Sequence, residues 1–178
     1  MKAQISFVEF ITALTIFIAS VTYISFQIST FIPKYLNEVK AERVRSEAFQ
    51  LSELLINDPG DPANWYAFNF NNVIRLGLSD ERENKTNFLS QNKISKFNEF
   101  CSNYLEVKKK LGLDYDFYLI LKDGETGEEK INCCASKIDC SILDQTLGLT
   151  QTRATITRIV AYIENNQVKY GEMILQVW

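Results

Sequence analysis

The feature that most constrains this sequence is an uncharged stretch of 24 residues, from Phe10 to Pro33. A helix of this length reaches about 35 Å at about 1.5 Å per residue, and a bilayer core is about 30 Å thick. A cleaved secretory signal has a shorter apolar region, of about 7–15 residues, and ends at a small-residue cleavage site that Ile32–Tyr35 does not offer. We therefore predict a membrane-spanning helix with membrane lipid as a partner, rather than a cleaved signal or a soluble core helix.

Residues 34–58 predict a continuation of this helix with a different surface. Apolar side chains recur every three to five positions and charged side chains fill the rest, which is typical of an amphipathic helix. The apolar positions are Tyr35, Leu36, Val39, Val44, Ala48, Leu51, Leu54 and Leu55. Pro59-Gly60-Asp61-Pro62 then ends the helix. The sequence thus predicts one helix over about residues 5–57. Residues 1–33 form a leader and transmembrane segment, and residues 34–58 form the amphipathic continuation of the helix.

Residues 59–178 predict a separate domain. Residues 64–70 alternate like a short strand or an extended segment. Residues 79–92 are polar and predict a surface loop, and residues 91–111 predict a second helix. A period of two predicts strands over residues 117–122, 129–133, 155–163 and 168–178. The second and fourth of these strands follow turns at residues 123–127 and at Asn165-Asn166. We expect an antiparallel sheet of about four strands covered by helix, and an α+β fold overall.

Composition excludes several classes of function. Because 19 Lys and Arg face 22 Asp and Glu, no basic surplus exists to hold a phosphate backbone, and we expect no nucleic-acid partner. Histidine is absent, which removes histidine-based triads and histidine metal sites. Asp123, Glu125 and Glu128 could hold Ca²⁺, but they fit a solvated hairpin turn better. With no phosphate-binding loop or nucleophile elbow either, we expect no enzyme activity and no cofactor.

The four cysteines are Cys101, Cys133, Cys134 and Cys140. An even number in an extracellular domain predicts two disulfide bonds. Cys101 lies on the apolar stripe of the predicted second helix, and Cys133 shares a strand face with Ile131, so we favour Cys101–Cys133 with Cys134–Cys140. Exchange of the two adjacent cysteines is the close alternative. A zinc site is a poorer interpretation because the sequence has no Cys-x2-Cys pair, and four free thiols would require a reducing compartment.

The opening residues MKAQISFVEFITALTIFIAS resemble the class III prepilin signal of archaeal type IV pilin-like proteins. That signal is similar to Lys-x-Gln-x-Ser-x-Glu at the edge of a hydrophobic helix; Lys2, Gln4 and Ser6 match it, and Glu9 is the candidate acid. The resemblance implies a long helix followed by a small sheet domain, and helices that bundle into a filament core. The stretch LLINDPGDPANW also looks like a feature of archaeal pilin-like proteins, and its simplest interpretation is a helix stop followed by a buried Trp65.

The same resemblance implies two site assignments. A prepilin-type peptidase would remove a short leader at Ala3, Gln4 and Ile5, by a cut after Ala3 or after Gln4. Glu9 would pair with a positive group, the freed α-amine of a neighbouring subunit, and so guide assembly. The simpler interpretation is that Glu9 lies near lipid headgroups, where the N-terminal helix dipole favours an anion.

The sequence gives conflicting indications of the orientation of the chain in the membrane. The positive-inside rule compares Lys2 with the basic residues that follow the apolar stretch, and it places the C-terminal domain in the cytoplasm. The prepilin resemblance, the cysteines and the glycosylation acceptor at Asn84 favour the outside. We predict a single-pass cell-membrane protein with residues 59–178 outside, or a cell-surface filament after processing.

Two functions follow from these observations. The first is a non-enzymatic pilin-like filament subunit or minor pilin, assembled through its N-terminal helix with copies of itself or with related subunits. The alternative is an unprocessed single-pass membrane protein that displays an extracytoplasmic binding or sensor domain. Thr15, Thr22 and Ser29 repeat every seven residues, and such a stripe of small residues favours helix association in lipid.

Overall fold

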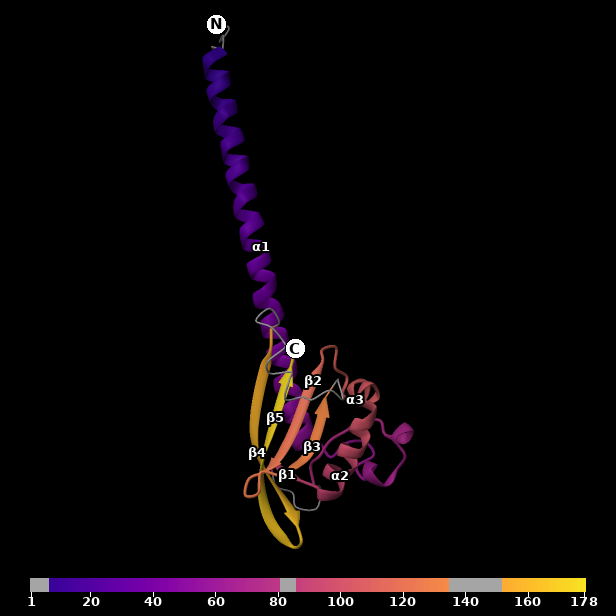
Figure 1. Cartoon of the computed structure of the whole chain (residues 1–178). Coiled ribbons are helices and arrows are strands. Elements are labelled where there is room, and N and C mark those ends of the chain that lie inside the picture. Colours follow the sequence, from indigo (N-terminus) through magenta and orange to yellow (C-terminus); the bar gives the residue numbers. More distant parts are fainter. Residues whose placement is uncertain (1–6, 81–85, 135–151) are drawn as a thin grey trace. The chain divides into compact units, whose positions relative to one another are not determined.

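The computed structural model describes residues 7–80, 86–134 and 152–178 (Figure 1). The chain divides into two compact units, Met1–Lys40 and Ala41–Trp178. The first helix, α1, spans Phe7–Asn57 and therefore belongs to both units. Its bounds confirm the helix predicted over residues 5–57 to within the described part of the chain, and the fold is the expected α+β arrangement of a long helix and a small sheet.

The part of α1 within the second unit lies against the domain core. Its buried residues recur at intervals of three or four and so form one stripe along the helix. They are Val44, Ala48, Leu51, Ser52, Leu55 and Ile56. The amphipathic interpretation of residues 34–58 is therefore confirmed from Val44 onward.

The described residues of the second unit contain a five-stranded sheet with strand order β1-β4-β5-β2-β3. The strands are β1 (Phe88–Leu89), β2 (Phe117–Asp123), β3 (Glu129–Cys134), β4 (Ala154–Glu164) and β5 (Gln167–Val177). Neighbouring strands from β4 to β3 pair antiparallel, whereas β1 pairs parallel with β4. The four predicted strands are therefore present and pair antiparallel as expected, and the added parallel strand β1 makes the sheet mixed. The strand β1 has only two residues and lies inside a polar stretch that was predicted to be a loop. It is too short to show the period of two that predicts a strand.

Two other predicted elements also differ. The helix expected over residues 91–111 is divided into α2 (Gln91–Phe100), the 3-10 turn η3 (Cys101–Asn103) and α3 (Tyr104–Leu111). Residues 64–70 do not form a strand; they contribute to the 3-10 turns η1 (Trp65–Ala67) and η2 (Phe70–Asn72). Backbone bonds there are local, such as Ala67 N to Asn64 O, so the alternation of aromatic residues reflects turn packing rather than strand pairing.

Turn chemistry agrees with the sequence at two positions. Gly112 ends α3 with a φ of 69°, a left-handed conformation that glycine adopts without steric cost. Asn165 and Asn166 join β4 to β5 with φ values of 53° and 62°, as expected for a two-residue hairpin turn.

The core lies between one face of the sheet and the helices. Its fully buried large side chains include Trp65, Phe97, Phe117, Leu119 and Tyr162. Trp65 is wholly buried, which confirms the simplest interpretation of the LLINDPGDPANW stretch.

Candidate functional site

The first unit presents an apolar surface to its surroundings. Large apolar side chains from Phe7 to Val39 are exposed on every side of α1. They are Phe7, Val8, Phe10, Ile11, Leu14, Ile16, Phe17, Ile18, Val21, Tyr23, Ile24, Phe26, Ile28, Phe31, Ile32, Tyr35, Leu36 and Val39. By length and composition α1 can cross a membrane, and none of its apolar window is buried within the described residues. A helix that is apolar all round needs lipid or other helices as its surroundings.

Five hydroxyl side chains of this apolar segment donate hydrogen bonds within the helix. The Thr15 hydroxyl donates to the Ile11 carbonyl at 2.8 Å, and the Thr22 hydroxyl donates to the Ile18 carbonyl at 2.8 Å. Thr12, Ser20 and Thr30 donate to carbonyls of the preceding turn in the same way. Such bonds remove hydroxyl donors from an environment that offers no water.

Glu9 lies in the first turn of α1 and is exposed. An anion at this end of a helix is favoured by about 0.3–1 kcal/mol through the helix dipole. The leader residues Ala3, Gln4 and Ile5 lie outside the described residues, so the structure places Glu9 without placing the processing site.

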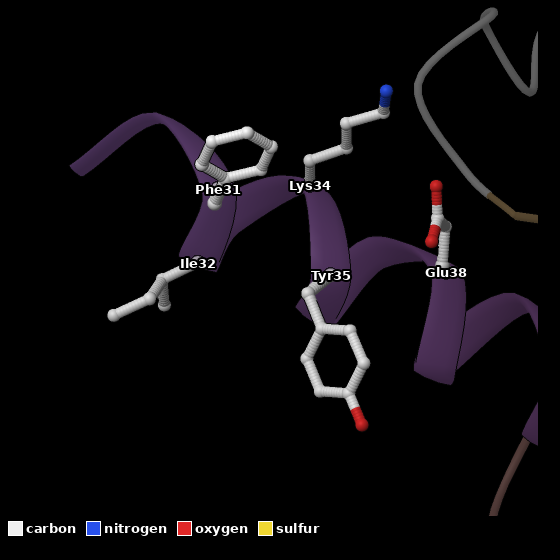
Figure 2. Close-up of a pocket in the computed structure, with 5 residues that line it drawn as sticks. All are labelled: Phe31, Ile32, Lys34, Tyr35 and Glu38. Atoms are coloured by element: carbon white, nitrogen blue, oxygen red, sulfur yellow. The ribbon is translucent and has the colours of Figure 1, made fainter. Parts of the chain in front are cut away.

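Five residues of α1 line a hollow of about 470 Å³ where the uncharged stretch ends: Phe31, Ile32, Lys34, Tyr35 and Glu38. Figure 2 shows Phe31, Lys34 and Glu38 on one side of the helix and Ile32 and Tyr35 on the other. Apolar residues give way here to a lysine, a tyrosine and a glutamate within two helical turns. Tyrosine and lysine are the side chains that anchor a helix at the headgroup level, with apolar parts inward and polar tips outward.

The structure contains the favoured disulfide between Cys101 and Cys133, whose Cα atoms are 5.2 Å apart. It joins the start of η3 to β3, which is an edge strand of the sheet. Beside it, the backbone N–H of Asn132 donates to the Asn98 side-chain oxygen at 3.0 Å, so α2 caps part of this edge. Cys134 is also disulfide-bonded. Cys140, predicted to be its partner, lies outside the described residues, as does the glycosylation acceptor Asn84.

Asp123 is buried rather than solvated, which corrects the interpretation of the turn that it begins. Its carboxylate accepts the Tyr162 hydroxyl at 2.6 Å and the backbone N–H groups of Glu125 and Thr126 at 2.9 and 2.8 Å. The Tyr162 bond, followed by the Thr126 N–H bond, holds the pKa of Asp123 well below its ordinary value of 3.8. Burial, together with the bond to Asp123, raises the pKa of Tyr162 well above its ordinary range.

An ion-pair network adjoins this carboxylate. Lys169 and Lys130 contact Glu164 at 2.8 and 3.0 Å, and Lys130 also contacts Glu128 at 2.9 Å. Hydrogen bonds from the two lysines lower the pKa of Glu164, and bonds to the carboxylates raise the pKa of each lysine. The charged forms are thereby stabilised. The network joins the β2–β3 turn to the turn end of the β4–β5 hairpin. Across the described residues, no group of three or more metal-ligating side chains could hold a metal ion.

The segment after α1 is fastened by contacts that the sequence did not reveal. The Trp65 indole donates to the Gly77 carbonyl at 2.8 Å. The buried Lys93 ammonium donates to the carbonyls of Pro59 and Ser79, both at 2.8 Å. Nothing in the spacing of Lys93 distinguishes it from a surface lysine, because its partners are 34 and 14 residues away.

Comparison with known proteins finds a relative of the chain that is itself uncharacterized. No family model matches the chain, and no solved structure matches it. The chain is 31% identical over 138 residues to an uncharacterized protein of Archaeoglobus fulgidus, and the alignment covers 68% of this chain and 70% of that protein.

Proposed function

The chain belongs to the same family as this uncharacterized archaeal protein, and we propose that it is a non-enzymatic, pilin-like subunit of a cell-surface filament. The observation that carries the proposal is the helix α1, which exposes apolar side chains on every side from Phe7 to Val39. Lipid would cover this surface before assembly, and the helices of other subunits would cover it afterwards. Exclusion from water favours both states, and the small residues of the helix permit close approach between copies.

Three further features support the proposal. The order of elements, a long helix followed by a small sheet domain, matches the expectation from the prepilin resemblance. The disulfide between Cys101 and Cys133 suits an oxidising, extracytoplasmic location for the domain. The N-terminal residues Lys2, Gln4 and Ser6 supply the resemblance to a peptidase signal.

In this proposal a prepilin-type peptidase cuts after Ala3 or Gln4, and Glu9 of an incoming subunit pairs with the new α-amine of its neighbour. An ionised carboxylate at the edge of hydrocarbon costs a few kcal/mol unless it is offset, and a nearby ammonium group offsets it. Such a pair would form only in the assembled state. It would therefore favour assembly without contributing to membrane insertion.

The test combines N-terminal sequencing with a substitution. Protein from native membranes should begin at Gln4 or Ile5, and Glu9→Gln should insert and fold normally while its filaments, counted by electron microscopy, are lost. Glu38→Gln, on the same helix beyond the uncharged stretch, is the matched control and should assemble. An intact Met1 together with a wild-type protein that forms no multimer would contradict the proposal. The chain would then act as an unprocessed single-pass anchor that displays its domain.

A further inference from the structure

The strand β4 has a free backbone edge along its first half. On one side β4 pairs with β5 over its whole length, whereas on the other side β1 pairs with it only near the hairpin end. The Ala161 N–H donates to the Asn87 carbonyl on the β1 side at 2.8 Å. Because the backbone groups of alternate residues in an antiparallel pair point to the same side, those of Thr155, Thr157 and Ile159 also point away from β5. Among the described residues, no hydrogen bond to these groups is found.

The side chains of this edge do not discourage a further strand. Natural sheets protect an edge with charged residues, proline, a bulge or a covering segment. Residues 154–160 contain neither proline nor glycine, and their one charged residue, Arg158, is paired with Glu53 of α1. Five of these seven residues are β-branched, which is the type that favours strands. Ile159 is 73% exposed, so the edge also offers an apolar side chain to a partner.

The opposite edge of the sheet differs in both respects. The outward N–H of Asn132 on β3 donates to the Asn98 side chain of α2 at 3.0 Å. β3 also contains the charged residues Glu129 and Lys130. The β3 edge is therefore partly capped, which disfavours a head-to-tail contact in which β4 of one copy pairs with β3 of the next.

We propose that β4 pairs antiparallel with β4 of a second copy of this chain, about a two-fold axis at Thr157. In this register Thr157 lies opposite Thr157 of the second copy, and Thr155 lies opposite Ile159. The free N–H and C=O groups of these residues then face each other and form two hydrogen bonds per residue pair. Arg158 lies opposite Ile156, so no like charges oppose each other. Any shift of the register leaves one of the three edge residues without a free partner.

The symmetry of this contact determines which copies it can join. Figure 1 shows that β4 and the part of α1 within the unit Ala41–Trp178 run in the same direction along the chain. The two-fold axis reverses β4 and therefore reverses this part of α1. The contact joins copies whose helices point in opposite directions, such as subunits of two filaments that lie side by side, rather than neighbours in one parallel bundle. It therefore goes beyond the proposed function and would also form between single-pass copies in two facing membranes.

Lipid nanodiscs that each hold one copy of the full chain test the contact, because two copies can then meet only from separate membranes. Sedimentation should show wild-type discs in pairs at about 100 μM. Thr157→Lys and Thr157→Glu should each weaken pairing about tenfold, since each places like charges opposite one another at the two-fold axis. An equimolar mixture of these two variants should restore pairing, because lysine then faces glutamate.

The matched control is Tyr170→Lys. Tyr170 is exposed and lies on the same face of the sheet as Thr157, but its strand β5 is flanked by β4 and β2 and has no free edge. This variant should pair like wild type. Circular dichroism of all three variants should match that of wild type, because both substituted side chains are exposed.

Wild-type discs that stay single at this concentration refute the inference. Pairing that Tyr170→Lys abolishes and Thr157→Lys leaves intact also refutes it, since the face of the sheet would then be the contact. Loss of pairing in both Thr157 variants without restoration in their mixture refutes the two-fold register. Filaments are counted separately: wild-type filaments with single discs leave the proposed function intact, and paired discs without filaments leave this inference intact.

Discussion

Replacing both Cys101 and Cys133 by alanine should destabilise the domain strongly, because their disulfide closes a long loop between η3 and β3. The bond spans a sequence separation of 32 residues. The loop-closure expression then gives about 12 cal/mol/K, or about 3.7 kcal/mol at room temperature, lost from the free energy of unfolding. Cys133 is wholly buried, so truncation of its side chain adds a cavity term. We expect a total loss of about 4–5 kcal/mol.

The measurement is urea unfolding of the full chain in a mild detergent, followed by near-ultraviolet circular dichroism. The bond of Cys134 is retained in the double variant, so the comparison isolates the Cys101–Cys133 loop. Single replacements at Cys101 and at Cys133 serve as controls, because each breaks the same bond and should lose nearly as much as the double variant. A loss below about 1 kcal/mol would refute the reasoning and show that packing of α2 on β3 already fixes this edge.

Four other predictions concern the same domain. A fragment of residues 41–178 should be soluble and show the near-ultraviolet spectrum of the full chain, because its core is complete from Val44 onward; aggregation of the fragment would contradict this. Trp65→Phe should lower the free energy of unfolding by about 2–4 kcal/mol, since it leaves the Gly77 carbonyl without its donor and opens a cavity. Gly77→Ala should prevent folding, because its Cβ would lie 2.1 Å from the Asp58 carbonyl oxygen. The folded pKa of Asp123 lies below its ordinary value of 3.8. The carboxylate therefore stabilises the fold above pH 3.8, and this stabilisation is lost as the pH falls through the folded pKa. Asp123→Asn should be less stable at pH 7 and should flatten the acid limb of a stability–pH curve.

The elements that the sequence predicts well are those with local causes. The apolar length of α1, the left-handed Gly112 and the Asn165-Asn166 turn each depend on residues that are neighbours in the chain. The favoured Cys101–Cys133 pair also depended on two local patterns, since each cysteine lies on the apolar face of its own element. Local periodicity is sufficient in such cases because it places the apolar side chains on one face of the element, and that face is the buried one.

The misassigned elements depend on partners far along the chain. Asp123 is buried because Tyr162, 39 residues later, donates to it, and no pattern around the turn reports that bond. β1 exists because its backbone meets β4, with Phe88 opposite Ala161. Residues 64–70 resembled a strand because aromatic residues alternate there, yet the backbone closes local turns. Tertiary contacts override local preference at these positions, and the preference alone does not reveal them.

The two halves of α1 suit different surroundings, and the sequence changes where the surroundings change. Hydroxyl groups that bond back to the helix are tolerated before Pro33, whereas charged side chains begin at Lys34. From Val44 onward the helix is part of a folded core, and the Arg158 guanidinium of β4 reaches the Ser52 hydroxyl at 3.3 Å and pairs with Glu53. A substitution before Pro33 should therefore alter insertion or assembly and leave domain stability unchanged, while a substitution after Val44 should alter both. This difference is what allows an assembly defect at Glu9 to be distinguished from a folding defect.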